Sequence, residues 1–138
     1  MREGFTTQLT VGIGDINYGG HVGNDRFLLF FQEARLRFLA GFGMSEAAVT
    51  PELGLIMTEA QVRYLAQVGY GETLAVRVTV ADIQKIRFTL RYRAVLAASG
   101  QAAAEGETTL AVFDYHKGRP GRMPEALREA LVARLETE

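Results

Sequence analysis

One segment of this 138-residue chain constrains its fold more than any other: a predicted helix that is apolar on nearly every side. Between residues 25 and 40, apolar side chains recur at helical spacing and spread well beyond one face, at Phe27, Leu28, Phe30, Phe31, Ala34, Leu36, Phe38 and Leu39. Asn24 or Asp25 is expected to cap its start, and Gly41 and Gly43 to end it. A helix with so wide an apolar surface is stable only when other elements surround it. The sequence therefore predicts a buried central helix.

The rest of the chain supplies strands that can wrap around that helix. Alternating apolar and polar residues predict strands over 5–11, 59–66, 74–80 and 86–94. Residues 108–115 form a last predicted strand, which is apolar on both faces from Leu110 to Phe113 and therefore central in the sheet. Residues 45–49 are expected to add a short helical turn, and residues 124–136 an amphipathic C-terminal helix. We expect a single α+β domain over residues 1–138, with an antiparallel β-sheet wrapped around a long central α-helix.

Composition narrows the chemistry that this chain can perform. It has no cysteine, which excludes disulfides, thiolate metal sites and a cysteine nucleophile, and its two histidines cannot form a three-histidine metal site. We expect no metal. A net charge of −1 leaves no basic surface for general nucleic-acid binding. No signal peptide is apparent, and the longest apolar run, Phe27–Phe31, is too short to cross a bilayer. We expect a soluble, cytoplasmic protein without nucleic-acid or membrane partners.

Polar side chains gather in a glycine-rich junction, residues 12–25, between the first predicted strand and the central helix. The segment from Gly14 to Arg37 reads GDINYGGHVGNDRFLLFFQEARLR and carries Asp15, Asn17, Tyr18, His21, Asn24, Asp25 and Glu33. The first amide N–H groups of a helix have no partner within that helix. They can hold a carbonyl oxygen on which negative charge develops, which suits an ester or thioester substrate.

This segment resembles the 4-hydroxybenzoyl-CoA thioesterase branch of the hotdog-fold thioesterases. That branch has a pattern similar to D-x-D-x-x-G-H-V-N-N-x-x-Y, followed by E-x-A-R on the next helix. Here the match runs from Asp15 to Asn24, continues with Phe27 at the aromatic position, and ends with Glu33-Ala34-Arg35. The resemblance implies the hotdog fold and hydrolysis of an acyl-CoA thioester to the free acid and CoA, with no cofactor other than the CoA of the substrate. It also implies a homodimer, often paired again into a homotetramer, with two sheets joined edge to edge and the substrate between the chains.

Two positions depart from this pattern. Asn17 stands where the family has its second aspartate, and Gly23 where it has the first of two asparagines. Asn17 cannot act as a base, although its amide can orient a water or a carbonyl. A carboxylate from elsewhere is then needed, and Asp15, Glu33 and Glu59 are the candidates.

Four residues are predicted to be catalytic: Asp15, Asn17, His21 and Glu33. Asn17 and His21 would position a water that Asp15 or Glu33 activates, while amides near Gly20–Val22 hold the acyl oxygen. Each residue also has a purely structural alternative, such as a turn contact for Asp15 or an ion pair between Glu33 and Arg37.

The predicted substrate-binding residues are Tyr18, Gly20, Val22, Asn24, Glu59, Arg63, Lys85, Ile86 and Arg87. In the family, the strand edge and loop that match Gln84–Arg87 run beside the pantetheine arm of CoA. Lys85, Arg87 and Arg63 would then meet its phosphates. The alternative is that the arginines at 87, 91 and 93 only form the solvated face of a strand.

Two other functions are compatible with the sequence. The first is a non-catalytic hotdog protein that binds acyl-CoA or an acyl carrier, which the replacement of the family aspartate by Asn17 favours. The second is a thioester dehydratase or hydratase that pairs His21 with Glu33 or Asp15, which the register of the motif disfavours.

Overall fold

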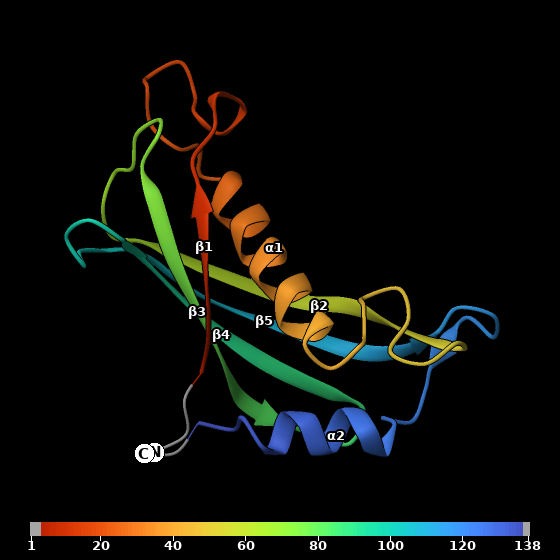
Figure 1. Cartoon of the computed structure of the whole chain (residues 1–138). Helices are drawn as coiled ribbons and strands as arrows, with labels where there is room; N and C mark the ends of the chain where they lie inside the picture. Colours follow the sequence, from red (N-terminus) through yellow and green to blue (C-terminus); the bar gives the residue numbers. More distant parts are fainter. Residues whose placement is uncertain (1–3, 137–138) are drawn as a thin grey trace.

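The computed structural model describes residues 4–136, which form one antiparallel sheet and two α-helices (Figure 1). The elements are β1 (Phe5–Thr10), a 3-10 turn η1 (Ile13–Asp15), α1 (Arg26–Ala40), β2 (Leu53–Tyr64), β3 (Thr73–Ile83), β4 (Arg87–Leu96), β5 (Ala102–Asp114), β6 (Arg119–Pro120) and α2 (Glu125–Val132). The strand order is β1-β3-β4-β5-β2, and the short β6 pairs with β5. The sheet curves around α1, as the sequence predicts (Figure 1).

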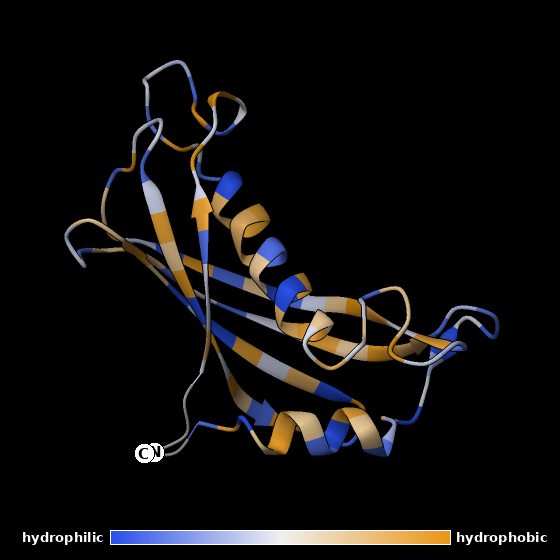
Figure 2. Ribbon diagram, viewed as in Figure 1, coloured by the Kyte–Doolittle hydropathy of each residue, from blue (hydrophilic) through white to orange (hydrophobic). Residues whose placement is uncertain are grey.

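The core lies between α1 and the inner face of the sheet. Alternate residues of β3 and β4 are fully buried there, namely Leu74, Val76, Val78, Val80, Phe88, Leu90, Tyr92 and Ala94. Hydropathy alternates along these strands in Figure 2, which is the expected pattern for a sheet with one buried face. Phe31 of α1 stacks on Tyr92 with 4.8 Å between ring centroids. A Cβ on Gly106 of β5 would lie 2.6 Å from Phe31, so glycine at this position lets the helix approach the sheet.

The structure corrects several predicted boundaries. β2 begins at Leu53 rather than near residue 59, because a bulge between Met57 and Glu59 shifts the register and breaks the apparent alternation. β5 begins at Ala102, six residues before the prediction. Residues 45–49 form no helix. Ser45 and Ala48 instead exchange backbone hydrogen bonds.

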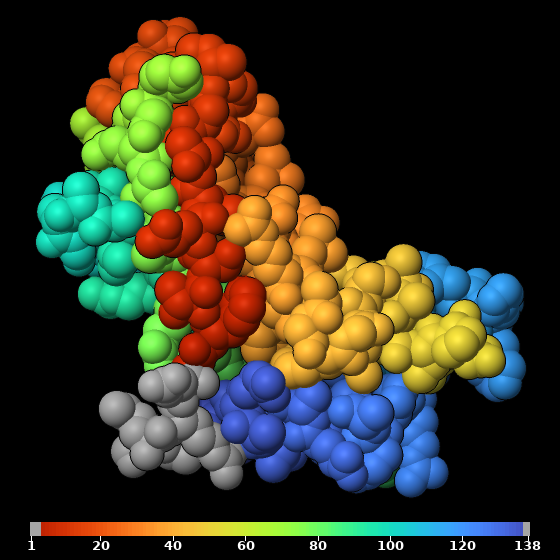
Figure 3. All heavy atoms as spheres, in the orientation of Figure 1, coloured from red at the N-terminus to blue at the C-terminus, as the bar shows by residue number. Residues whose placement is uncertain are grey.

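The C-terminal helix is shorter than predicted. α2 ends at Val132, and the chain then runs alongside β3, where Leu135 forms a parallel bridge with Val80. The buried faces of Leu127 and Leu131 confirm the predicted apolar stripe. α2 closes the end of the molecule opposite the junction (Figure 3). No helix within residues 4–136 is long and apolar enough to cross a membrane.

Strand β2 leaves one edge of the sheet open. Within residues 4–136 it pairs only with β5, and its residues from Ile56 to Arg63 are exposed except for the half-buried Val62. Large apolar side chains are among them, including Ile56 at 39% and Met57 at 41% exposure, and Tyr64 at the end of the strand is 51% exposed. Long apolar edge strands are rare in monomers because they pair with other chains. The open β2 edge is therefore the part of the sheet best suited to contact a second chain.

Candidate active site

The first half of the junction is a tight turn closed by Asn17. The Oδ1 atom of Asn17 accepts hydrogen bonds from the amides of Gly19, at 2.9 Å, and His21, at 3.5 Å. The Asn17 amide donates to the His21 carbonyl at 2.8 Å, and Gly20 adopts φ +81°, a conformation that favours glycine. Asn17 thus holds the loop that presents His21, whose side chain is exposed. Tyr18, at the tip of the turn, is fully exposed to solvent.

Asp15 is tied into the backbone on the other side of the junction. Its Oδ2 atom accepts a hydrogen bond from the Gly12 amide at 2.8 Å, and its carbonyl accepts one from Gly23 at 3.0 Å. The side chain therefore stabilises η1, which is the structural alternative for this residue.

The amides available to an acyl oxygen differ from those predicted. Gly20 donates to the Asn17 carbonyl at 3.0 Å, and Val22 donates to the Val68 carbonyl at 2.8 Å. These amides are occupied because the turn and its bridge to the β2–β3 loop use them. Within residues 4–136, the amides of Asn24 and Asp25 donate to no acceptor. The free N–H groups lie at the start of α1, one turn beyond Gly20–Val22.

The start of α1 lacks the predicted side-chain cap. Asp25 occupies the N-cap position, but neither it nor Asn24 caps the helix through its side chain. The backbone of Asp25 is already helical, with φ −74° and ψ −22°, whereas a capping residue needs an extended backbone to reach the first-turn amides. The carbonyl of Asn24 accepts a hydrogen bond from the Tyr64 hydroxyl at 2.7 Å. This bond holds the end of β2 against the junction.

A groove of about 290 Å³ runs from this helix start along α1 and β2. Its walls are mostly apolar, with a few polar groups among them; the lining residues are Asp25, Leu28, Leu29, Gln32, Arg35, Glu46, Leu55, Met57 and Leu110. An apolar groove with a few polar groups is the usual form of a site for a small organic ligand. None of the predicted site residues lines it, although Asn24 directly precedes Asp25.

A buried polar network closes the far end of the groove. Arg35, with a side chain only 3% exposed, donates to Glu46 at 2.5 Å and to the Tyr92 hydroxyl at 3.0 Å. The Tyr92 hydroxyl also shares a hydrogen bond of 2.6 Å with Thr108, and Gln32 donates to Glu46 at 3.3 Å. Burial raises the pKa of Tyr92, so the hydroxyl keeps its proton. The sequence contains a signal for this network: an arginine on a predicted buried helix must find a partner.

The other two candidate carboxylates do not face the groove. Glu33 forms an ion pair of 3.0 Å with Arg37, which also donates to Thr7 and to the Gln8 carbonyl of β1. Glu33 thus lies on the β1 side of α1, in the ion pair with Arg37 that is its structural alternative. Glu59 lies in the middle of β2, opposite Thr109, rather than near the start of the strand. It is exposed on the outer face of the sheet.

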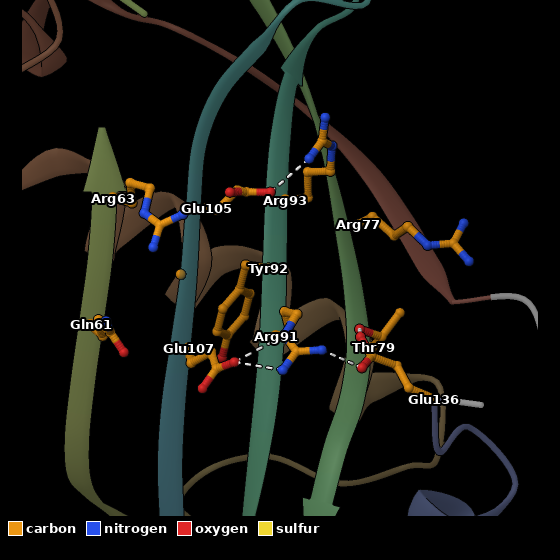
Figure 4. A pocket seen from close by; sticks show the side chains of 11 residues that line it. Gln61, Arg63, Arg77, Thr79, Arg91, Tyr92, Arg93, Glu105, Glu107 and Glu136 are labelled. Carbon is orange, nitrogen blue, oxygen red and sulfur yellow. Dashed lines mark hydrogen bonds and ion pairs between the residues drawn. The ribbon is translucent and has the colours of Figure 1, made fainter. Parts of the chain in front are cut away.

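The arginines of the sheet lie on its outer face, away from α1 (Figure 4). Four of them line a pocket of about 370 Å³ with Glu105, Glu107 and Glu136, namely Arg63, Arg77, Arg91 and Arg93. Arg91 pairs with Glu107 at 2.7 Å and with Glu136, and Arg93 pairs with Glu105 at 2.6 Å. Arg91 and Arg93 therefore lie where the structural alternative places them, on the solvated face of a strand. Arg63 lines the same pocket without an ion pair in the described part of the chain.

Lys85, Ile86 and Arg87 lie at the turn between β3 and β4, far from the junction. The junction adjoins the Thr73 end of β3, and the turn follows Ile83 at the other end. At roughly 3.3 Å per residue, β3 separates the two regions by about 30 Å. Arg128 of α2 anchors this turn by donating to the carbonyls of Gln84, at 2.9 Å, and Lys85, at 3.3 Å. A single chain does not bring Lys85 and Arg87 to the junction.

Comparison with known proteins identifies the family. A family model described as the thioesterase-like superfamily matches residues 11–131. A Synechocystis protein named "Putative esterase sll0410" is 29% identical over 119 residues, which cover 84% of this chain and 71% of that protein.

Two solved structures illustrate the fold. The Synechocystis protein Slr0204, a 1,4-dihydroxy-2-naphthoyl-CoA thioesterase, is 22% identical, with a TM-score of 0.85 over 93% of this chain and 95% of its own. Staphylococcus aureus SAV2348, solved in complex with CoA, is 21% identical, with a TM-score of 0.88 over 100% of this chain and 90% of its own. Together with the sheet curved around α1, these likenesses confirm the hotdog fold. Because the family model matches most of this chain, residues 11–131, the chain belongs to the thioesterase-like superfamily.

Proposed function

We propose that this protein hydrolyses an acyl-CoA thioester to the free acid and CoA. The observation that carries the proposal concerns the amides of Asn24 and Asp25. They donate to no acceptor within residues 4–136, and Asp25 lines a mostly apolar groove. The amides would hold the thioester oxygen while the groove receives the acyl group. Two structural neighbours add support: one is named as an acyl-CoA thioesterase, and the other was solved with CoA.

The reaction that suits this site is attack by an activated water. As the water oxygen bonds to the acyl carbon, negative charge moves onto the carbonyl oxygen, where the two amides stabilise it. A carboxylate accepts the proton of the water, and breakage of the C–S bond releases the CoA thiolate. His21 and Asn17, in the adjoining turn, would orient the water. Asp15 and Glu33 remain the carboxylates predicted from the sequence, each with one structural contact already described.

The complete site is proposed to lie between two chains. Antiparallel pairing of two β2 edges would place the Leu53 end of one strand beside the Tyr64 end of the other. This pairing would also bring the partner's β3–β4 turn closer to the junction. Lys85 and Arg87 of one chain would then meet the CoA phosphates of a substrate whose thioester lies at the other chain's junction. Within one chain, the junction and the β3–β4 turn lie about 30 Å apart along β3. Two paired chains would allow the junction of one and the turn of the other to bind the same substrate.

An assay against acyl-CoAs of graded size tests the activity directly. We expect release of free CoA, measured with a thiol reagent, at rates well above the uncatalysed reaction for at least one acyl group. Omission of the protein and heat-treated protein are the controls. Absence of turnover on every substrate, from folded protein, contradicts the proposal.

Dilution tests the two-chain site. We expect light scattering to show a dimer or tetramer at micromolar concentration and specific activity to fall on dilution over the range in which the assembly dissociates. The physical reason is that the junction and the β3–β4 turn of a single chain are too far apart to bind the same substrate molecule. A monomer with full activity would refute the shared site.

A non-catalytic binding protein is the second candidate, because Asn17 replaces the family aspartate and is bonded to two backbone amides. The Asn17→Asp variant distinguishes a thioesterase from a non-catalytic binding protein. Activity that appears only in the variant identifies a binding protein, whereas hydrolysis by the natural chain identifies an enzyme. Hydration of an enoyl thioester, detected by product analysis, would instead indicate a hydratase.

A further inference from the structure

Among the described residues, two carboxylates line the groove, and one of them has no hydrogen-bond or ion-pair partner there. Glu46 is bound to Arg35 at 2.5 Å and to Gln32 at 3.3 Å. Within residues 4–136, the carboxylate of Asp25 forms no ion pair and accepts no hydrogen bond. It stands at the end of the groove where the Asn24 and Asp25 amides are free, next to the apolar side chain of Leu28.

We propose that Asp25 is the catalytic carboxylate of this site, acting as the general base for the attacking water. This assignment rests on the proposed thioesterase function. As the water oxygen bonds to the acyl carbon, Asp25 takes one proton from the water, and the carbonyl electron pair moves onto the oxygen. When the carbonyl re-forms, the C–S bond breaks and its electron pair leaves on sulfur. The proton held by Asp25 passes to that thiolate, which restores the carboxylate and yields the acid and CoA.

Gly23 supplies a second observation that points to the same carboxylate. A Cβ at position 23 would lie 2.7 Å from Oδ1 of Asp25, closer than such atoms approach in proteins. The backbone of Gly23 does not have a positive φ, so it adopts a conformation open to other residues. The atom that a Cβ would meet is the end of a flexible side chain, so a side chain at position 23 would move the Asp25 carboxylate from its present place.

The two departures from the family pattern thereby acquire one explanation. Asn17 removes a carboxylate from the turn, and Gly23 makes room for one two residues further on. The carboxylates predicted from the sequence are less suitable. Asp15 accepts the Gly12 amide, Glu33 is paired with Arg37, and Glu59 lies on the outer face.

Substitution of Asp25 is the direct test, with acyl-CoA hydrolysis by the full-length protein as the readout. Asp25→Asn preserves the shape of a side chain that makes no cap hydrogen bond, so the fold should be retained. We expect kcat to fall by at least about 100-fold, the usual contribution of a general base, with little change in KM. Asp25→Glu should recover part of kcat. Glu129→Gln, an exposed carboxylate of α2, is the matched control and should leave kcat unchanged.

Gly23→Ala tests the position of the carboxylate. It should lower kcat in the natural background by displacing Asp25. In the Asp25→Asn background it should cause no further loss, because the side chain that it displaces can no longer act as a base. A purely structural role of Gly23 would lower kcat in both backgrounds. Circular dichroism and thermal unfolding verify that each variant is folded.

The outcomes separate the two levels of the argument. If the natural protein hydrolyses no acyl-CoA, the proposed function and the Asp25 assignment both fail. If the natural protein is active and Asp25→Asn keeps its kcat, only the Asp25 assignment is overturned. Asp15→Asn and Glu33→Gln then test the other two carboxylates. The assignment is supported if Asp25→Asn lowers kcat and the addition of Gly23→Ala to that variant lowers kcat no further.

Discussion

Replacing Arg35 with methionine is expected to lower the free energy of unfolding by about 3–5 kcal/mol, the range for removing one partner of a buried ion pair. Arg35 is 3% exposed and contacts both Glu46 and Tyr92. Methionine fills a similar volume but leaves a partly buried carboxylate and a buried hydroxyl without their donor. The network also shapes the far end of the groove, so its loss should disturb acyl binding.

Urea denaturation followed by circular dichroism measures this effect. Arg93→Met is the matched control, because Arg93 pairs with Glu105 on the outer face at 53% and 37% side-chain exposure. Exposed pairs contribute about 0–1 kcal/mol, so the control should change stability little. The Arg35→Met/Glu46→Gln double variant should lose less free energy of unfolding than the sum of the losses in the two single variants. The reason is that the double variant leaves no unpaired charge at this site. Equal effects of Arg35→Met and Arg93→Met would contradict this account.

Truncating Phe31 to alanine is expected to lower the free energy of unfolding by about 3–5 kcal/mol as well. The ring is fully buried, stacks on Tyr92 and fills the space above Gly106. Its removal leaves a cavity between α1 and the sheet and loosens the helix that forms one wall of the groove.

The matched control for this substitution is Leu36→Ala on the same helix, since Leu36 is 37% exposed. Its cost in urea denaturation should be clearly smaller. Gly106→Ala is also expected to be destabilising, because the new Cβ would meet Phe31 at 2.6 Å and the Gln61 carbonyl at 2.7 Å. In the Phe31→Ala background, Gly106→Ala should cost less. Similar losses for Phe31→Ala and Leu36→Ala would show that Phe31 is not the main contact between helix and sheet.

Local periodicity was sufficient to predict the architecture. Side chains alternate across a strand and recur every three to four residues on a helix, so element type and buried face are written into short stretches of sequence. The stripe around Phe31 and the alternation around Val78 therefore identified the central helix and the sheet correctly. The prediction failed where register is not local. The bulge after Met57 shifts β2 relative to β5 and conceals the first half of the strand.

The sequence by itself determined the hotdog architecture, the family and the junction where polar groups gather. Only the tertiary structure decided which of those groups are free. Asp15, Asn17 and Glu33 form hydrogen bonds or ion pairs through their side chains, and in the described part of the chain the Asp25 side chain does not. The structure alone also joined Arg35 to Tyr92, 57 residues away. Side-chain partners depend on distances between elements that are remote in the chain, and periodicity carries no information about those distances.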